Sequence, residues 1–299
     1  MNTDISFRWH SGSGGRIHYA EIGDSGAPLI ICLHGFPEYW AGWHEIMIAL
    51  SPRYHVVAPD QRGFNLSFKP QGAAAYHTHH MVTDLVELAD ELSPDKPFIL
   101  AGHDWGAAVA YAYAIAHPER LSHLVIANGV HPACFQRAIF DDPDQRAASQ
   151  YINRLRSSGM EKRMAADNYA RTLNMIEGFS HTDWMNEEIR KRYIAAWSQP
   201  GAMQAMLNWY RSSPIIVPAI GEEPPASKLL QLPDDALAIR MPHLVVWGED
   251  DEALRPSCLE GLDRYAADLT IERISGTGHW ILHERPEEVA EAIDQFVNR

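Results

Sequence analysis

Short runs of hydrophobic residues recur along most of the chain and are separated by segments with helical spacing. Six runs have the length of a strand, and they cover residues 29–34, 55–60, 97–102, 123–128, 243–248 and 269–275. Hydrophobic residues are continuous in these runs rather than alternating, which is typical of strands covered on both faces. The pattern therefore predicts an α/β fold with a mostly parallel central sheet flanked by helices.

Other patterns place a hairpin and helices around this sheet. Residues 7–22 form two short polar–apolar segments around a Gly/Ser turn, as a β-hairpin does. Helical spacing covers residues 81–92, 105–116 and 286–299, and Val289, Ile293, Phe296 and Val297 share one face of the last segment.

The alternation of strands and helices stops between about residues 134 and 220. The stretches 146–176, 186–197 and 202–211 are amphipathic or charged helical segments without an obvious strand. We interpret this region as an inserted helical cap, so that residues 1–133 and 221–299 form the core and residues 134–220 the cap. Residues 212–228, rich in Pro and Ser, predict a connecting loop out of the cap.

Charge and composition narrow the classes of partner. The chain has 39 acidic and 25 basic residues, and the formal net charge of -14 opposes binding to nucleic acid or to an anionic membrane. No hydrophobic run reaches the roughly 20 residues of a membrane span, and the first residues lack the features of a secretory signal. The three cysteines, Cys32, Cys134 and Cys258, are scattered. We expect a reduced, cytoplasmic protein that binds a small neutral, largely apolar substrate, and a homodimer remains open.

The motif GHDWG at residues 102–106 lies between a hydrophobic run and a helical segment. It has the form G-x-nucleophile-x-G, in which small flanking residues allow a tight strand-to-helix turn that exposes the central side chain. That central residue is Asp104. Taken alone, it also fits a helix N-cap, a role that aspartate often takes. Motifs at the ends of other predicted strands favour the nucleophile.

Motifs after three of the predicted strands supply the other groups that a nucleophile needs: a backbone N–H donor, an acid and a base. The sequence HGFP at residues 34–37 predicts an oxyanion hole made by the N–H groups of Phe36 and Trp105. WGEDD at residues 247–251 supplies an acid, and GTGHW at residues 276–280 supplies His279. The chain order is then nucleophile, acid and histidine.

Together these motifs resemble the α/β-hydrolase superfamily and, within it, the epoxide hydrolase branch, which is related to the haloalkane dehalogenases. The resemblance covers almost the whole chain, through HGFPEYWAGW, VVAPDQRGFNLSFKP, GHDWGAAVAYAYAIAHPERL, LNWYR, VVWGEDDEAL and GTGHW. It implies an α/β-hydrolase fold with a helical cap and an aspartate nucleophile. It also implies Asp251 as the acid, with Asp250 and Glu249 as alternatives. In LNWYR and SQYINRL it identifies Tyr210 and Tyr151 as the residues that hold an epoxide oxygen.

An aspartate nucleophile suits attack on an sp3 carbon, because the product is an ester that water can later cleave. A carboxylate ordinarily carries its charge at neutral pH, so His279, oriented by Asp251, is free to activate water. An epoxide leaves as an alkoxide, which a tyrosine can protonate. The prediction is hydrolysis of an epoxide to a vicinal diol without a cofactor or metal. The expected walls of the substrate pocket are His34, Pro37, Trp105, Trp209 and Trp280.

Two alternatives remain open. A haloalkane or haloacid dehalogenase could use the same Asp104. However, Phe36 stands where haloalkane dehalogenases often carry a halide-binding asparagine, and the helix after Asp104 has no arginine for a substrate carboxylate. The second alternative is a non-catalytic receptor for a small molecule. The intact nucleophile, acid and histidine argue against it.

Overall fold

The computed structural model describes residues 4–299, which are built around an eight-stranded sheet with the order β1-β2-β4-β3-β5-β6-β7-β8. The strands are β1 (Ser6–Ser11), β2 (Arg16–Ile22), β3 (Leu29–Leu33), β4 (His55–Pro59), β5 (Phe98–His103), β6 (Leu121–Ala127), β7 (His243–Gly248) and β8 (Leu269–Ile274). β1, β2 and β4 pair antiparallel, and the other neighbours pair parallel. The predicted hairpin and the mostly parallel sheet are confirmed.

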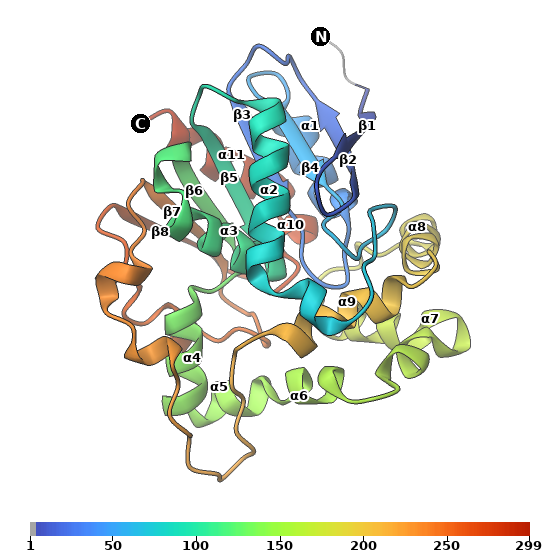
Figure 1. Ribbon diagram of the computed structural model, residues 1–299, viewed down its shortest axis with the longest axis vertical. Coiled ribbons are helices and arrows are strands. Elements are labelled where there is room, and N and C mark those ends of the chain that lie inside the picture. The colour runs from blue at the N-terminus through green and yellow to red at the C-terminus, as the bar shows by residue number, and fades with distance from the viewer. Residues whose placement is uncertain (1–3) are drawn as a thin grey trace.

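Helices cover both faces of this sheet (Figure 1). One face carries α2 (Thr78–Leu92) and α3 (Trp105–Ala116), and the other carries α1 (His44–Leu50), α10 (Ile281–Glu284) and α11 (Pro286–Val297). In β3, Ile31 and Leu33 pack into the core under α2 and α3, whereas Ile30 and Cys32 pack into the core under α1 and α11. This two-sided burial explains the continuous hydrophobic runs. The pattern did not predict α1 and α10, because such short helices show little periodicity.

Six α-helices lie between β6 and β7, and we call them the cap. They are α4 (Pro132–Asp141), α5 (Pro143–Ala148), α6 (Gln150–Arg156), α7 (Met160–Gly178), α8 (Glu187–Trp197) and α9 (Ala202–Ser212). Figure 1 shows them gathered at one end of the sheet, where β6 leads into α4. The predicted helical stretch 146–176 is divided, because α5 ends before Ser149 and α7 begins after Gly159, which has a φ of 76°. Residues 213–228 contain no helix or strand, as predicted for a loop.

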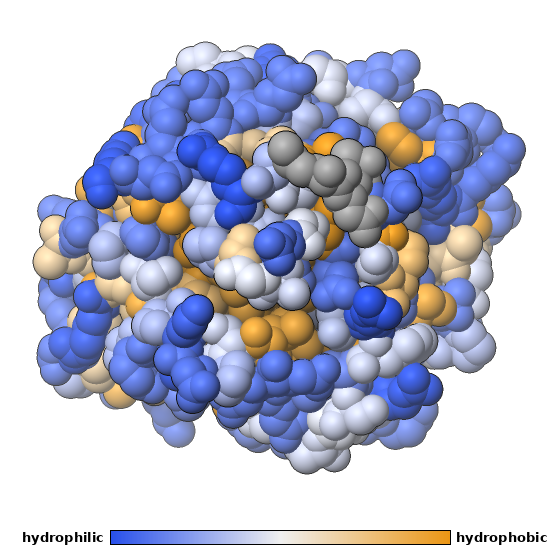
Figure 2. Space-filling view, turned by 90° about the horizontal axis from the view of Figure 1, so that it is seen from above, coloured by the Kyte–Doolittle hydropathy of each residue, from blue (hydrophilic) through white to orange (hydrophobic). Residues whose placement is uncertain are grey.

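Several large aromatic side chains are buried, whereas Phe7 and Trp9 are exposed. On the face shown in Figure 2, hydrophilic residues predominate and hydrophobic residues show through in patches between them. Trp43, Trp197 and Trp247 are fully buried. Cys32, Cys134 and Cys258 are buried free thiols. Within residues 4–299, no helix has the length and apolar character needed to cross a bilayer, and no three His, Cys, Asp or Glu side chains are grouped to hold a metal ion.

Candidate active site

Asp104 occupies a sharp turn between β5 and α3. Its backbone angles, φ 51° and ψ -119°, lie in a region that residues other than glycine rarely adopt. The turn also requires close packing against β3. A Cβ atom at Gly106 would lie only 2.1 Å from the carbonyl oxygen of Leu33. The predicted strand–turn–helix geometry is therefore present, and it projects the Asp104 side chain beyond the end of the sheet.

The loop after β3 brings a backbone donor to this carboxylate. The N–H of Phe36 donates a hydrogen bond of 2.7 Å to Oδ1 of Asp104. Only glycine fits at position 35, because a Cβ atom there would lie 2.4 Å from Oδ1 of Asp104. The N–H of Trp105 is the first of α3, so the helix itself supplies no acceptor for it. Phe36 thus contacts Asp104 directly, as a donor of the predicted oxyanion hole would.

The imidazole of His279 lies between two carboxylates. Its Nδ1–H donates to Oδ2 of Asp251 at 2.9 Å, and its Nε2 lies 3.7 Å from Oδ2 of Asp104. Oδ1 of Asp251 accepts two further hydrogen bonds from the N–H groups of Ala253 and Leu254. The two alternative acids, Asp250 and Glu249, are exposed. The structure therefore pairs His279 with Asp251.

Nearby charge changes the proton affinity of this pair. Burial by itself lowers the pKa of His279, but the carboxylates of Asp251, Asp104 and Glu38 together raise it to about 9. Burial raises the pKa of Asp251, and this is outweighed by His279 and by the hydrogen bonds from Leu254 and Asn128, so that the pKa falls below its usual value. The carboxylates around His279 therefore favour the protonated form of its imidazole.

Two cap tyrosines face Asp104 from the opposite side. Tyr151 lies on α6 and Tyr210 on α9, with their ring centroids 6.3 Å apart. Tyr210 also packs edge-on against Phe36 and Trp105, at 5.1 and 5.0 Å. Burial, with a smaller contribution from the Asp104 charge, raises the pKa of both tyrosines above its usual value. Both hydroxyls therefore remain O–H donors at neutral pH.

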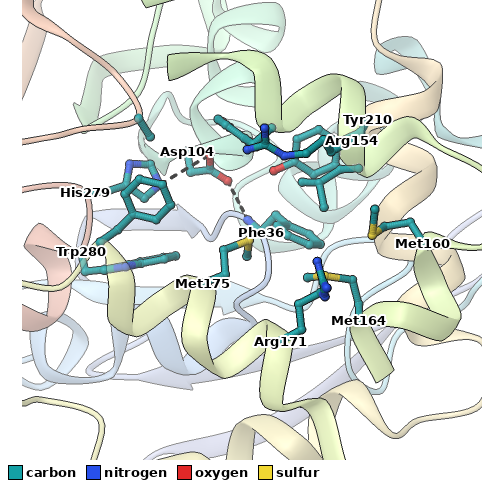
Figure 3. A pocket seen from close by; sticks show the side chains of 14 residues that line it. Phe36, Asp104, Arg154, Met160, Met164, Arg171, Met175, Tyr210, His279 and Trp280 are labelled. Atoms are coloured by element: carbon teal, nitrogen blue, oxygen red, sulfur yellow. Dashed lines mark hydrogen bonds and ion pairs between the residues drawn. The ribbon is translucent and has the colours of Figure 1, made fainter. Parts of the chain in front are cut away.

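A cavity of about 220 Å³ joins these groups (Figure 3). Asp104, His279, Tyr151 and Tyr210 line it, and most of its remaining wall is apolar. The other wall residues are Phe36, Arg154, Leu155, Met160, Met164, Arg171, Met175, Phe179, Ala253 and Trp280. A second cavity of about 80 Å³ shares Asp104 and both tyrosines and is lined on one side by Trp105. The carboxylate is thus accessible to a small, largely apolar molecule.

Of the five expected wall residues, Trp105 and Trp280 line these cavities and three lie elsewhere. The ring Nε2 of His34 accepts a hydrogen bond from the N–H of Gln61, and the carbonyl of Pro37 accepts one from the indole of Trp197. Trp209 donates to the carbonyl of Arg62 and packs against Trp105. Neither of these two cavities is lined by His34, Pro37 or Trp209, whose hydrogen bonds join them to other parts of the core and cap.

Asn128, at the end of β6, is a supporting residue that the sequence analysis did not identify. Its side-chain amide donates 2.8 Å to Oδ2 of Asp251 and accepts 2.7 Å from the N–H of Gly248. It therefore orients the acid that orients His279. A signal existed, since a polar residue follows the hydrophobic run 121–127 at the carboxyl end of a parallel strand, where functional side chains of such sheets gather.

Glu38 forms a second supporting cluster that sequence analysis also missed. Its buried carboxylate lies 3.1 Å from Nδ1 of His103 and 2.5 Å from Nε2 of His283, and it accepts 2.9 Å from the hydroxyl of Tyr193 in the cap. Nε2 of His103 lies 2.8 Å from the carbonyl oxygen of His279. Burial alone would raise the pKa of Glu38, but His283 and His103 hold it well below its usual value. This ionised cluster ties α8 of the cap to the loop that carries His279.

Tyr193→Phe tests the link between this cluster and the cap. A hydrogen bond to a buried charged group contributes about 1.5–3 kcal/mol, so we expect the free energy of unfolding to fall by that amount. Urea unfolding measures the change. Tyr39→Phe is the matched control, because within residues 4–299 its hydroxyl has no hydrogen-bond partner. Equal effects of the two variants would contradict a stabilising role for the contact between Tyr193 and Glu38.

The comparisons with known proteins agree with this architecture. Residues 28–286 match the model of the α/β-hydrolase fold family. The chain is 32% identical to the AB hydrolase superfamily protein YfhM of Bacillus subtilis (strain 168) over 288 residues, 95% of each chain. It is 30% identical to epoxide hydrolase 4 of Homo sapiens over 294 residues, 95% of this chain and 76% of that protein. A solved structure of a novel epoxide hydrolase from metagenomes of hot environments is 35% identical, with a TM-score of 0.88 over 98% of this chain and 99% of that one. The chain therefore belongs to the α/β-hydrolase superfamily, in its epoxide hydrolase branch.

Proposed function

We propose that the protein hydrolyses an epoxide to a vicinal diol through a covalent ester on Asp104. One observation carries the proposal. In a single cavity, the carboxylate of Asp104 faces the His279 imidazole on one side and two tyrosine hydroxyls of the cap on the other. That arrangement provides a nucleophile, a base for the second step and proton donors for the leaving oxygen. Relatives named as epoxide hydrolases support the same assignment.

In the first step, Oδ2 of Asp104 attacks an epoxide carbon and the ring C–O bond breaks. The electron pair of that bond goes to the epoxide oxygen, which Tyr151 and Tyr210 hold by hydrogen bonds. One of the two hydroxyls gives its proton to that oxygen, and the resulting tyrosinate regains a proton, through solvent, from protonated His279, which becomes neutral. Oδ1 keeps its hydrogen bond from the Phe36 N–H, so the carboxylate is held in one orientation. The product of this step is a hydroxyalkyl ester of Asp104.

In the second step, the ester is hydrolysed. His279 takes a proton from water, and the resulting hydroxide attacks the ester carbonyl carbon of Asp104. The oxyanion forms at Oδ1 and is stabilised by the N–H groups of Phe36 and Trp105. Its collapse expels the diol oxygen, which takes the proton from His279. Asp104 is left as a carboxylic acid, and it regains its charge by giving its proton to His279. Asp251 and Asn128 hold the imidazole in the orientation that this transfer requires.

The tyrosines favour an epoxide over the halide of a dehalogenase. A departing halide is a stable anion and requires no proton, whereas an alkoxide requires an acid. Tyr151 and Tyr210 line the same cavity as Asp104, and their raised pKa keeps both hydroxyls protonated, which matches the second requirement. The deciding experiment gives the purified protein a panel of epoxides and haloalkanes and assays diol and halide together. We expect diol. Halide alone would make the protein a dehalogenase, and the absence of both products and of any covalent adduct would favour a non-catalytic receptor.

The charge of Asp104 predicts a pH effect. Since that charge helps to raise the pKa of His279 to about 9, formation of the neutral ester lowers this pKa and releases the imidazole as a base. Ester hydrolysis should therefore accelerate with rising pH and level off below pH 9. In the free protein, NMR titration should give His279 a pKa near 9, and a lower one in Asp104→Asn. Identical titration of both proteins would contradict this electrostatic coupling.

A further inference from the structure

Gln145, on α5 of the cap, lies against the loop that follows β7. Its side chain is fully buried, with an exposed fraction of 0%. The amide nitrogen Nε2 donates to the carbonyl of Ala253 at 3.0 Å and to the hydroxyl of Ser149 at 2.9 Å. The oxygen Oε1 accepts from the N–H of Arg255 at 2.7 Å and from the thiol of Cys258 at 3.2 Å. All four hydrogen-bonding positions of the amide are therefore occupied.

One of these hydrogen bonds holds the backbone that in turn holds Asp251. The C=O of Ala253 and the N–H of Leu254 belong to one peptide group, which is planar, so they point in opposite directions. Gln145 donates to the C=O of this group at 3.0 Å, and the N–H of the same group donates to Oδ1 of Asp251 at 2.9 Å. The N–H of Ala253 donates to the same oxygen at 2.8 Å. A side chain that fixes one edge of the peptide group therefore fixes the direction of the donor on its other edge.

A second contact joins the start of α5 to the same loop. Asp142 caps the N-terminus of α5 with one carboxylate oxygen, and the other oxygen accepts 2.6 Å from the hydroxyl of Ser257. α5 has only six residues, so this contact and those of Gln145 hold most of the helix against the loop. At the other end of the loop, Asp251 binds Nδ1 of His279 at 2.9 Å. A chain of hydrogen bonds thus runs from the cap to the acid and the histidine.

We propose that Gln145 is a positioning residue for hydrolysis of the ester, because it holds the peptide group that keeps the carboxylate of Asp251 directed at His279. The inference rests on the proposed function. Asp104 attacks the epoxide without a base, so formation of the ester does not depend on Gln145. The cap thereby acts in both steps of the reaction, through its two tyrosines in the first step and through Gln145 in the second.

The test replaces Gln145 with methionine, which has a similar size but does not replace the hydrogen bonds of the amide. Buried backbone groups that lose their partners are costly, so the loop should shift toward other partners. Since a misplacement of about 1 Å can cost roughly 100-fold in rate, ester hydrolysis should slow by about 10- to 100-fold, while ester formation keeps its rate. The substrate is styrene oxide, or the epoxide of the panel that gives diol fastest. Rapid quenching and intact-mass measurement should show a larger fraction of Asp104 ester during turnover than in the wild type.

Gln136→Met is the matched control. Gln136 is equally buried in the cap, on α4, and its amide also holds a backbone segment. It donates to the carbonyl of Ile216 at 2.9 Å and accepts from the N–H of Ile216 at 2.8 Å. Ile216 lies in the loop that leaves the cap, so Gln136→Met should hydrolyse the ester at the wild-type rate. If either methionine variant does not fold, Gln145→Ala and Gln136→Ala give the same comparison, because the smaller side chain leaves room for water at the freed groups.

Titration of His279 by NMR separates this inference from the proposed function, because it requires no substrate. The carboxylate of Asp251 raises the pKa of His279, so its displacement should lower this pKa in Gln145→Met and not in Gln136→Met. If no epoxide yields diol or adduct but the titration shifts in Gln145→Met alone, the proposed function fails and the positioning of Asp251 by Gln145 stands. If the wild type forms diol and Gln145→Met titrates and hydrolyses the ester as the wild type does, the positioning role is wrong and the proposed function stands. Equal slowing of ester hydrolysis in both variants would also overturn the role, since it would show a general effect of loosening the cap.

Discussion

Replacing His279 with glutamine is expected to stop the reaction after its first step and to leave a stable ester on Asp104. Glutamine has similar size but cannot take a proton from water, whereas Asp104 attacks the epoxide without a base. Loss of a general base lowers rates by roughly 10²–10⁴-fold, so turnover should fall by at least that factor. Intact-mass measurement after exposure to substrate should show the protein heavier by the mass of one epoxide.

The control for this experiment removes the nucleophile as well. A His279→Gln/Asp104→Asn protein should gain no mass, because an amide does not attack the epoxide. Peptide mapping should place the adduct of the single variant on the segment that contains Asp104. Undiminished turnover by His279→Gln, or an adduct that persists in the double variant, would exclude the ester mechanism.

Replacing both Tyr151 and Tyr210 with phenylalanine is the second change with a large expected effect. The epoxide oxygen would then leave as an alkoxide with no proton donor, and kcat/KM should fall by roughly 10²–10⁴-fold. Either single variant should retain part of the activity, because one hydroxyl can still donate to the oxygen. Initial rates of diol formation measure the effect.

Tyr169→Phe provides the matched control for the loss of a tyrosine hydroxyl from the cap. The hydroxyl of Tyr169 donates to the carbonyl of Trp197, and its ring packs beside that residue, away from the cavity wall. We expect it to keep normal turnover. If Tyr151→Phe/Tyr210→Phe also kept full epoxide turnover, the two tyrosines would not be the proton donors.

The fold could be predicted because each strand of the parallel part of the sheet produces its own run of hydrophobic residues in the sequence. A strand covered on both faces, such as β3, requires apolar residues at every position, and the hydrophobic run at residues 29–34 reports this directly. Short or interrupted helices show a weaker periodicity of hydrophobic residues in the sequence. The seven residues of α1 and the interrupted α7 could not be delimited, because their boundaries depend on packing and on backbone turns rather than on periodicity.

The site could be predicted only in part, for a related reason. Asp104, His279 and a run of three acids were recognisable because each lies in the segment that follows a strand. The contact that distinguishes Asp251 from Asp250 joins it to Asn128 and His279, which are 123 and 28 residues away in the chain. The spacing of residues along the sequence does not show whether Asp250 or Asp251 turns toward His279 at the end of β7.

The sequence by itself determined the order of strands and helices, the turn at Asp104 and the kinds of reactive groups available. These properties follow from local periodicity and from the convergence of parallel strand ends at one edge of a sheet. Only the tertiary structure decided which acid pairs with His279 and which residues line the cavity. Those outcomes depend on how the cap helices pack over the sheet, and packing between distant segments is set by the whole set of contacts rather than by any one stretch of the chain.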